Sequence, residues 1–285
     1  MGGLRDDGAL CILCETPKTF EDWAKFAAVT ENGGDRLVPI WRLVLPWSVA
    51  LELLSNYQYN VKTLGDLIKV YRGGSTEELG YRSNEMLDRL QAVFPLRGRT
   101  VIEFGPSDGN RTSDLLAAGV AQVTAIEGRP ENALKMLVAK YVMGWRNVDL
   151  VMDNFQSSGP WATRRYDLAF AQGVYYHCQN PFVFFDGLVR LSDAIFIGGW
   201  CCNDKKPAAP WMVLEHDGVK YRGKGYTEAS SYLSGLASTS YMLDKEDIQK
   251  FFAQRGYRTK FCHVAAHEAP SALGPEYAEI FVVKE

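Results

Sequence analysis

Residues 100–109 read TVIEFGPSDG: a short β-rich run, predicted as a strand over 100–104, passes directly into a turn with two glycines. Residues 110–118, which follow the turn, can form a helix. Gly105 and Gly109 leave the main chain without a Cβ at the carboxyl end of the strand, beside the helix N-terminus, so a ligand can approach the backbone there. Such a turn occurs in many α/β proteins, and it indicates a ligand site only together with further signals.

Short apolar strands alternate with amphipathic helices from this turn as far as residue 199. The further strands are predicted over 122–126, 148–152, 166–171 and 194–199, and the helices over 84–94, 130–141 and 182–191. This alternation predicts right-handed crossovers and a parallel sheet that is covered on both faces.

The C-terminal part has a different pattern. Asp217-Gly218 lies between two β-rich arms within 211–226 and predicts a hairpin. A helix is predicted over 243–256, with Asp244 as its N-cap. The last two strands, 257–265 and 277–284, have no helix-length segment between them and should pair as an antiparallel hairpin.

Composition excludes several classes of protein. The chain has 285 residues, 47% hydrophobic and 23% charged, with a net charge of −3, which is typical of a globular protein and argues against a general polyanion binder. No signal peptide or membrane helix is recognised, so we expect a cytoplasmic protein without a membrane partner. Cys11 and Cys14 form the one CxxC pair among six cysteines, which does not support a zinc site, and no metal is expected.

Two further strands end in polar residues suited to a nucleotide. The second predicted strand is followed by Glu127, 18 residues after Gly109, where a carboxylate can accept hydrogen bonds from both ribose hydroxyls. The third is followed by Asp153 and Asn154, which can read an adenine ring. All these groups lie at strand carboxyl ends, where open α/β sheets bind ligands.

The fourth strand leads into residues 170–182, FAQGVYYHCQNPF. With Glu103, Gly105, Gly109, Glu127 and Asp153, this segment resembles the class I S-adenosylmethionine-dependent methyltransferases over roughly residues 80–200. Within that family, GVYYH and the leader YRSNEMLDRL (81–90) are most similar to the branch of the tRNA wobble-uridine carboxymethyltransferases and their uncharacterised relatives.

The resemblance implies an α/β fold: a Rossmann-like, seven-stranded, mostly parallel sheet with a C-terminal antiparallel hairpin. It implies S-adenosylmethionine as cofactor and S-adenosylhomocysteine as product. Residues near the methionine part of the cofactor would be Glu103, Gly105 and Gly109; Glu127 would hold the ribose, Asp153 and Asn154 would read adenine, and Gln172 and Gly173 would line the floor beneath the methyl group. One position departs from the family pattern, because Ser107 stands where the middle glycine of the turn is usual.

The catalytic candidates come from the segment after the fourth strand. His177 is the candidate base, since the residues after this strand face the reactive methyl group in the family's fold. The alternative is that His177 only orients a neighbour or caps the next helix. Tyr175 and Tyr176 could offer a hydroxyl or an aromatic face to a cation, although at least one of them should pack in the core. His216, beside the Asp217-Gly218 turn, is expected to be exposed, and His263 with His267 is not expected to bind a metal.

The domain organisation follows from these patterns. A mostly helical N-terminal extension is predicted over 1–75, and a methyltransferase domain over 76–285, with an insertion at 200–241 that lies over the active site. The leading hypothesis is a methyltransferase that modifies a small molecule. Two alternatives stay open: a tRNA-modifying methyl- or carboxymethyltransferase, and a non-catalytic binding protein with an apolar surface around 41–47. An oligomer could form through the N-terminal region.

Overall fold

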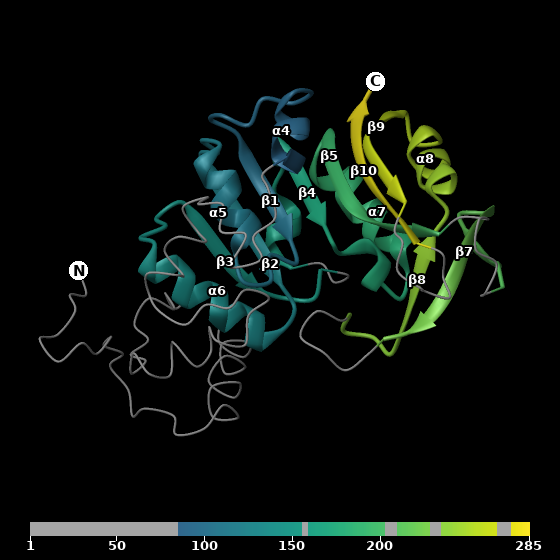
Figure 1. Cartoon of the computed structure of the whole chain (residues 1–285), viewed down its shortest axis with the longest axis horizontal. Helices are drawn as coiled ribbons and strands as arrows, with labels where there is room; N and C mark the ends of the chain where they lie inside the picture. The colour runs from purple at the N-terminus through teal and green to yellow at the C-terminus, as the bar shows by residue number, and fades with distance from the viewer. Residues whose placement is uncertain (1–84, 156–158, 203–209, 229–234, 267–274) are drawn as a thin grey trace, which may run out of the picture.

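The computed structural model describes residues 85–155, 159–202, 210–228, 235–266 and 275–285. The predicted N-terminal extension lies outside these residues. The centre of the described part is a seven-stranded sheet (Figure 1). Its strands, in spatial order, are β3 (Val148–Met152), β2 (Gln122–Glu127), β1 (Thr100–Phe104), β4 (Leu168–Gln172), β5 (Ala194–Cys202), β10 (Pro275–Lys284) and β9 (Tyr257–Ala266).

The first five strands are parallel, and the last two are not. β1 pairs in parallel with both β2 and β4, whereas β10 runs antiparallel between β5 and β9. The predicted fold class is therefore confirmed, including the C-terminal hairpin. β5 continues three residues beyond its predicted end at 199, because β10 pairs with it as far as Cys202.

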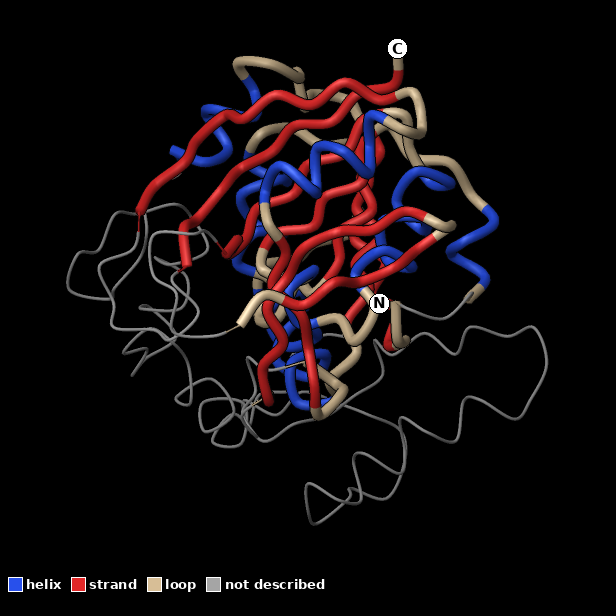
Figure 2. Tube along the Cα trace, turned by 90° about the vertical axis from the view of Figure 1, so that its right-hand side faces the viewer, coloured by secondary structure: helices blue, strands red, loops and turns tan. Residues whose placement is uncertain are grey.

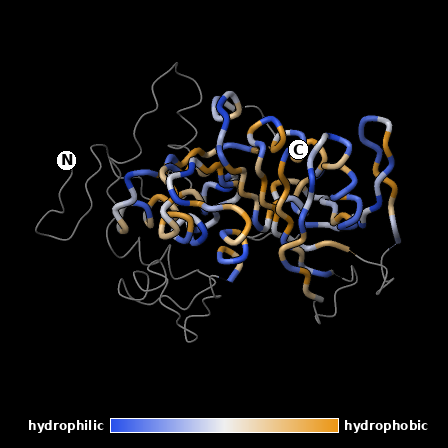
Figure 3. Tube along the Cα trace, turned by 90° about the horizontal axis from the view of Figure 1, so that it is seen from above, coloured by the Kyte–Doolittle hydropathy of each residue, from blue (hydrophilic) through white to orange (hydrophobic). Residues whose placement is uncertain are grey.

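Helices cover both faces of the sheet (Figure 2). The helices are α4 (Glu85–Gln91), α5 (Asn110–Ala117), α6 (Pro130–Val142), α7 (Pro181–Leu191) and α8 (Lys245–Ala253). Alternate residues of β1 serve opposite faces, as a pleated strand requires: Val101 joins the core under α4, α5 and α6, and Ile102 joins the core under α7 and α8. Figure 3 shows hydrophobic stretches through the interior of the described part.

A second, three-stranded antiparallel sheet follows β5. It consists of β6 (Met212–His216), β7 (Val219–Thr227) and β8 (Thr239–Leu243) and lies at the right of Figure 1. The Asp217-Gly218 hairpin is confirmed, with φ of 51° and 73° at its two turn residues, as a tight two-residue turn requires. β8 packs against β5 and against the short 3₁₀ helix η5 (Tyr175–His177) that follows β4. The small sheet is thereby held at the carboxyl edge of the central sheet.

In the described ranges, no helix is long and apolar enough to cross a membrane. At the carboxyl edge, the 3₁₀ helix η4 (Pro160–Thr163) lies between β3 and β4, and η5 lies between β4 and α7. The edge that carries the predicted ligand groups is therefore built from β1, β2, β3 and β4.

Phe185 anchors α7 in an aromatic cluster, and its truncation should destabilise the fold. Its side chain is fully buried against Tyr175 and against the α8 rings of Phe251 and Phe252. Phe185→Ala should lower the free energy of unfolding by about 3–5 kcal/mol, measured by urea denaturation. Val183 lies on the same helix but is 40% exposed, so Val183→Ala is the matched control and should stay within about 1 kcal/mol of the parent. Equal effects of the two substitutions would contradict this packing.

Candidate functional site

The turn after β1 is built from residues with positive φ. Gly105, Ser107 and Gly109 have φ of 61°, 54° and 86°. A Cβ at Gly105 would lie 2.9 Å from the side chain of Val174, so only glycine fits there. Ser107 adopts the left-handed conformation despite its side chain, and its backbone N–H donates to the Glu127 carboxylate. The departure from the family's glycine pattern thus leaves the turn intact.

Glu127 ties the end of β2 to this turn. Its Oε2 accepts a hydrogen bond from the Ser107 N–H at 2.9 Å, and its Oε1 accepts one from the Arg129 N–H at 2.8 Å. Burial raises the pKa of Glu127, although the hydrogen bonds from Arg129 and Ser107 oppose that rise. The carboxylate therefore lies at the junction of two strand ends, where the sequence placed the ribose site.

Two more carboxyl groups lie in this region. Burial raises the pKa of Glu103 to about 8, although the Thr112 hydroxyl donates to its Oε2 at 2.6 Å. Burial likewise raises the pKa of Asp108 to about 7, while its Oδ1 accepts from the Asn110 N–H. Asp108 belongs to the predicted turn but was not singled out as a site residue. Because burial disfavours the charged form of all three acids, a cation beside them would restore part of the lost solvation.

A tryptophan orients Asp153, the residue that follows β3. The Trp161 indole N–H, from η4, donates to Asp153 Oδ2 at 2.7 Å. A Cβ at Gly159 would lie 2.2 Å from that oxygen, so glycine is required for this approach. Asn154 is exposed at the same edge. The sequence did not single out Trp161 or Gly159, because their contact with Asp153 spans a connection without a motif.

The end of β4 places Gln172 and Gly173 beside β5. Gly173 has φ of 78°, and its N–H donates to the Gly198 carbonyl at 2.7 Å. Gln172 Cγ would be 3.1 Å from a Cβ at Gly198, so the two strand ends approach closely. Gln172 and Gly173 therefore occupy the carboxyl edge next to η5, where the floor of the site was predicted.

The two tyrosines of η5 have different environments. Tyr175 is fully buried, and its hydroxyl donates to the Trp200 carbonyl and contacts the Cys201 thiol at 3.2 Å. Burial raises the pKa of Tyr175 well above its ordinary value. Tyr175 is thus a core residue, and the prediction that it could contact the substrate is wrong. Tyr176 is half-buried, with its carbonyl accepting from the Tyr226 hydroxyl.

His177 is paired with an acid that sequence reasoning missed. Its Nδ1 lies 2.8 Å from Oε1 of Glu228, just beyond the end of β7. The alternative in which His177 caps α7 is not supported, because Asn180 is the cap: its Oδ1 accepts from the N–H groups of Phe182 and Val183. No local signal links residues 177 and 228, which lie 51 positions apart.

The segment before β8 contacts both halves of the site. Arg129 donates from Nη2 to the Gly235 carbonyl at 2.6 Å, and Leu236 lies so close to Gly128 that a Cβ there would be 2.7 Å from it. A Cβ at Gly235 would lie 2.4 Å from the His177 carbonyl. Gly235 and Leu236 thus pack between the end of β2 and η5.

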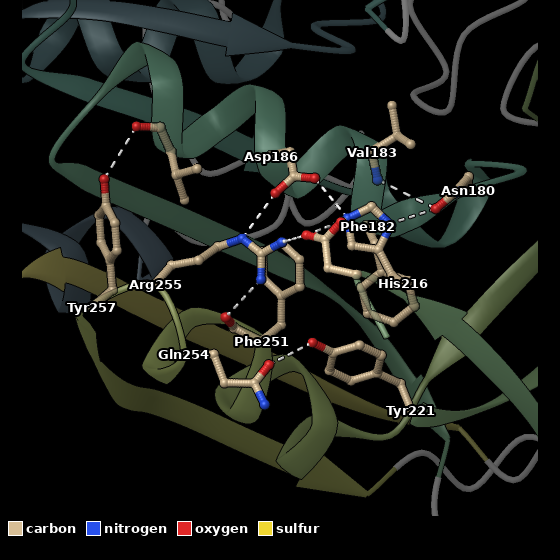
Figure 4. A network of polar contacts seen from close by, with 12 residues as sticks. Asn180, Phe182, Val183, Asp186, His216, Tyr221, Phe251, Gln254, Arg255 and Tyr257 are labelled. Atoms are coloured by element: carbon tan, nitrogen blue, oxygen red, sulfur yellow. Dashed lines mark hydrogen bonds and ion pairs between the residues drawn. The ribbon is translucent and has the colours of Figure 1, made fainter. Parts of the chain in front are cut away.

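His216 is not exposed, contrary to the expectation from its place beside a turn. Its side chain is 13% exposed, stacks on Phe182, and lies with Nε2 2.7 Å from Oδ2 of Asp186 (Figure 4). The long-range contact with α7 explains the difference. A residue's place beside a hairpin turn does not show which helix packs against it.

The carboxylates around His216 are bound by an arginine. Asp186, His216 and Asp217 form the one group with metal-ligand spacing among the residues that the structure describes. The Arg255 guanidinium, stacked over Phe251, donates to Asp186 at 2.9 Å and to Asp217 at 2.7 Å (Figure 4). This cation neutralises the acids that a metal would need, so the group serves to fasten α7, α8 and the β6–β7 turn.

Comparison with known proteins supports the resemblance drawn from the motifs. No family model matches the chain. Over 123 residues it is 32% identical to the tRNA U34 carboxymethyltransferase of Methylococcus capsulatus, a match that covers 42% of this chain and 36% of that protein. The chain therefore spans about a third of the length of the curated relatives it matches. The predicted resemblance to class I methyltransferases, and to the wobble-uridine branch, is confirmed.

Solved structures share the fold. The N-terminal domain of EvdMO1, determined in the presence of SAH and D-fucose, has a TM-score of 0.59 and 19% identity, covering 72% of this chain and 84% of that one. Magnesium protoporphyrin IX methyltransferase of Synechocystis PCC 6803, determined with bound SAH, has a TM-score of 0.51 and 13% identity, covering 84% and 95%. At these identities the likeness shows the fold alone.

The buried acid Glu103 predicts a pH dependence of stability. The native group keeps its proton up to about pH 8 and the unfolded group only to about 4.5, so the native state binds more protons in that interval. The contribution of Glu103 to stability therefore falls as pH rises from about 4.5 to 8. Glu103→Gln, which cannot ionise, should gain stability relative to the parent as pH rises, measured by urea denaturation at about pH 5 and about pH 8.

Glu215, exposed on β6, provides the control for this measurement. The stability difference between Glu215→Gln and the parent should change little over the same range. A Glu103→Gln difference that stays constant with pH would contradict the burial of an ionisable group at this position.

Proposed function

We propose that the chain is an S-adenosylmethionine-dependent methyltransferase that acts on a small-molecule acceptor. The observation that carries the proposal is Glu127, whose carboxylate is held by the turn after β1 at the edge where a ribose would lie. The fold shared with methyltransferases and the similarity to the carboxymethyltransferase of Methylococcus capsulatus support it.

The residues present fit this cofactor. Glu127 would accept hydrogen bonds from the ribose hydroxyls, and Asp153, oriented by Trp161, would face the adenine. Bound S-adenosylmethionine supplies a methyl group on a cationic sulfonium and carries an ammonium group. Burial raises the pKa values of Glu103 and Asp108 to about 8 and about 7, and a cation bound beside these carboxyl groups would favour their ionised form.

The chain's own residues would mainly position the reactants. In-line methyl transfer needs little from the protein beyond alignment and a place for the acceptor's proton. His177, at the carboxyl edge after β4, would take that proton. Tyr226 is a weaker candidate, because burial raises its pKa well above the ordinary value and its hydroxyl is engaged with the Tyr176 carbonyl.

The second candidate function is modification of tRNA. It is favoured by the names of the matched relatives, which are tRNA U34 carboxymethyltransferases. The net charge of −3 favours the small molecule, because RNA binding draws most of its affinity from basic side chains. A cytoplasmic location and an oligomer through the N-terminal region stay predictions.

Glu127→Ala tests the cofactor site. Calorimetry should detect S-adenosylhomocysteine binding to the parent, and the substitution should weaken it at least about 10-fold, through the lost ribose hydrogen bonds to a charged group. Asp149→Asn, on the neighbouring strand β3 and exposed, is the control and should bind as the parent does. Absence of binding to the parent at millimolar ligand would reject the proposal.

Salt dependence separates the two acceptor classes. Fluorescence anisotropy with bulk tRNA should give a dissociation constant weaker than about 1 μM at physiological salt, as for non-specific binding. Submicromolar binding that falls steeply as salt increases would instead favour the tRNA modifier. Bovine serum albumin, another acidic protein, provides the baseline for non-specific association.

A further inference from the structure

We infer that Glu228 is a positioning residue for His177: it fixes the imidazole with its proton on Nδ1 and leaves Nε2 to receive the proton of the acceptor. This inference rests on the proposed function and assigns a role to a residue that no motif marks. The observation behind it is the 2.8 Å contact between His177 Nδ1 and Glu228 Oε1.

The backbone holds Glu228 in place. Its N–H donates to the Ser238 carbonyl at 3.0 Å, directly after the pairing of β7 with β8. Its side chain is 6% exposed, whereas that of His177 is 20% exposed, so the acid lies behind the imidazole. Gly235 makes room for the pair, since a Cβ there would lie 3.1 Å from Glu228 Oε1.

The charge of Glu228 decides which nitrogen of the ring carries hydrogen. Burial alone would raise the pKa of Glu228, but the neighbouring Ser240 and His177 outweigh burial and lower it. Glu228 is therefore ionised at neutral pH, and a carboxylate can only accept hydrogen bonds. The Nδ1 of His177 must then be the donor, in the neutral as well as in the charged ring.

This arrangement leaves Nε2 as the nitrogen with a lone pair. Among the described residues, Nε2 of His177 has no hydrogen-bond partner. An imidazole that is held at Nδ1 by a carboxylate is a better proton acceptor at Nε2, because the carboxylate stabilises the imidazolium that forms. The charge of Glu228 thus has two effects: it fixes the tautomer of the neutral ring, and it stabilises the ring once His177 has taken up a proton.

The transfer then balances in charge. The acceptor's lone pair forms a bond to the methyl carbon while the carbon–sulfur bond breaks. The electron pair of the broken bond stays on sulfur. The acceptor's proton moves to Nε2, so that the positive charge lost from the sulfonium reappears on His177 beside Glu228. A base is useful for an acceptor that keeps its proton until transfer. The pair therefore points to a weakly acidic O–H or N–H group on the substrate, and not to a thiolate or a stabilised carbanion.

The test reads the tautomer directly, without any substrate. Long-range ¹H–¹⁵N NMR of the full chain, at a pH high enough for neutral imidazole, distinguishes the two tautomers of His177, and the spectrum of His177→Phe identifies its signals. In the parent, the Nδ1–H form should dominate by about tenfold or more. Glu228→Ala should shift His177 toward the Nε2–H form, which free histidine prefers. Glu228→Gln should keep the Nδ1–H form, because the amide oxygen can still accept.

Glu215→Ala, on the exposed face of the same small sheet, is the matched control and should leave the His177 signals unchanged. A dominant Nε2–H form in the parent, or an unchanged tautomer in folded Glu228→Ala, would overturn the inference. Calorimetry with S-adenosylhomocysteine on the same samples separates this outcome from the proposed function. If the parent fails to bind the nucleotide, the methyltransferase proposal fails. The tautomer measurement needs no nucleotide, so it still decides whether Glu228 orients His177.

Discussion

The two hydrogen bonds that Glu127 accepts hold the candidate site together. They join the turn after β1, through Ser107, to the start of the α6 connection, through Arg129. Without an acid at this position, the two N–H groups would lose their acceptor at the carboxyl edge, and the turn would lose the contact that holds its left-handed residue. The side chain proposed to bind ribose is therefore also the one that shapes its own surroundings.

The acids of this region lower the stability of the free protein. Glu103 and Glu127 are buried and Asp108 is half-buried, and burial raises the pKa values of all three because it disfavours their charged forms. A fold selected for stability alone would place apolar residues or amides there. Carboxyl groups suit such positions where a ligand supplies the missing positive charge, and the cationic cofactor of the proposed methyltransferase would do so. The destabilisation in the free protein and the affinity for the ligand then have the same origin.

The sequence predicted most of the fold but only part of the site. The strands of the central sheet follow from local patterns, and β1 and β3 have their predicted bounds. β8 was missed, since its five residues show no strict alternation and gain their stability from pairing with β7. Trp161 and Glu228 were missed for the same reason, because each meets its partner through tertiary structure. His216 was misjudged because Asp186, on α7, covers it.

The small sheet connects these observations. β7 ends one residue before the acid that holds His177. Ahead of β8, Gly235 and Leu236 pack against Arg129 and Gly128 at the end of β2. One element thus contacts the predicted ribose edge and the predicted base. A displacement of that segment would alter both the Arg129 contact and the space around Glu228. Alignment of cofactor and acceptor is what methyl transfer demands of a protein. The small sheet is therefore placed to couple the proposed cofactor site to the proposed base.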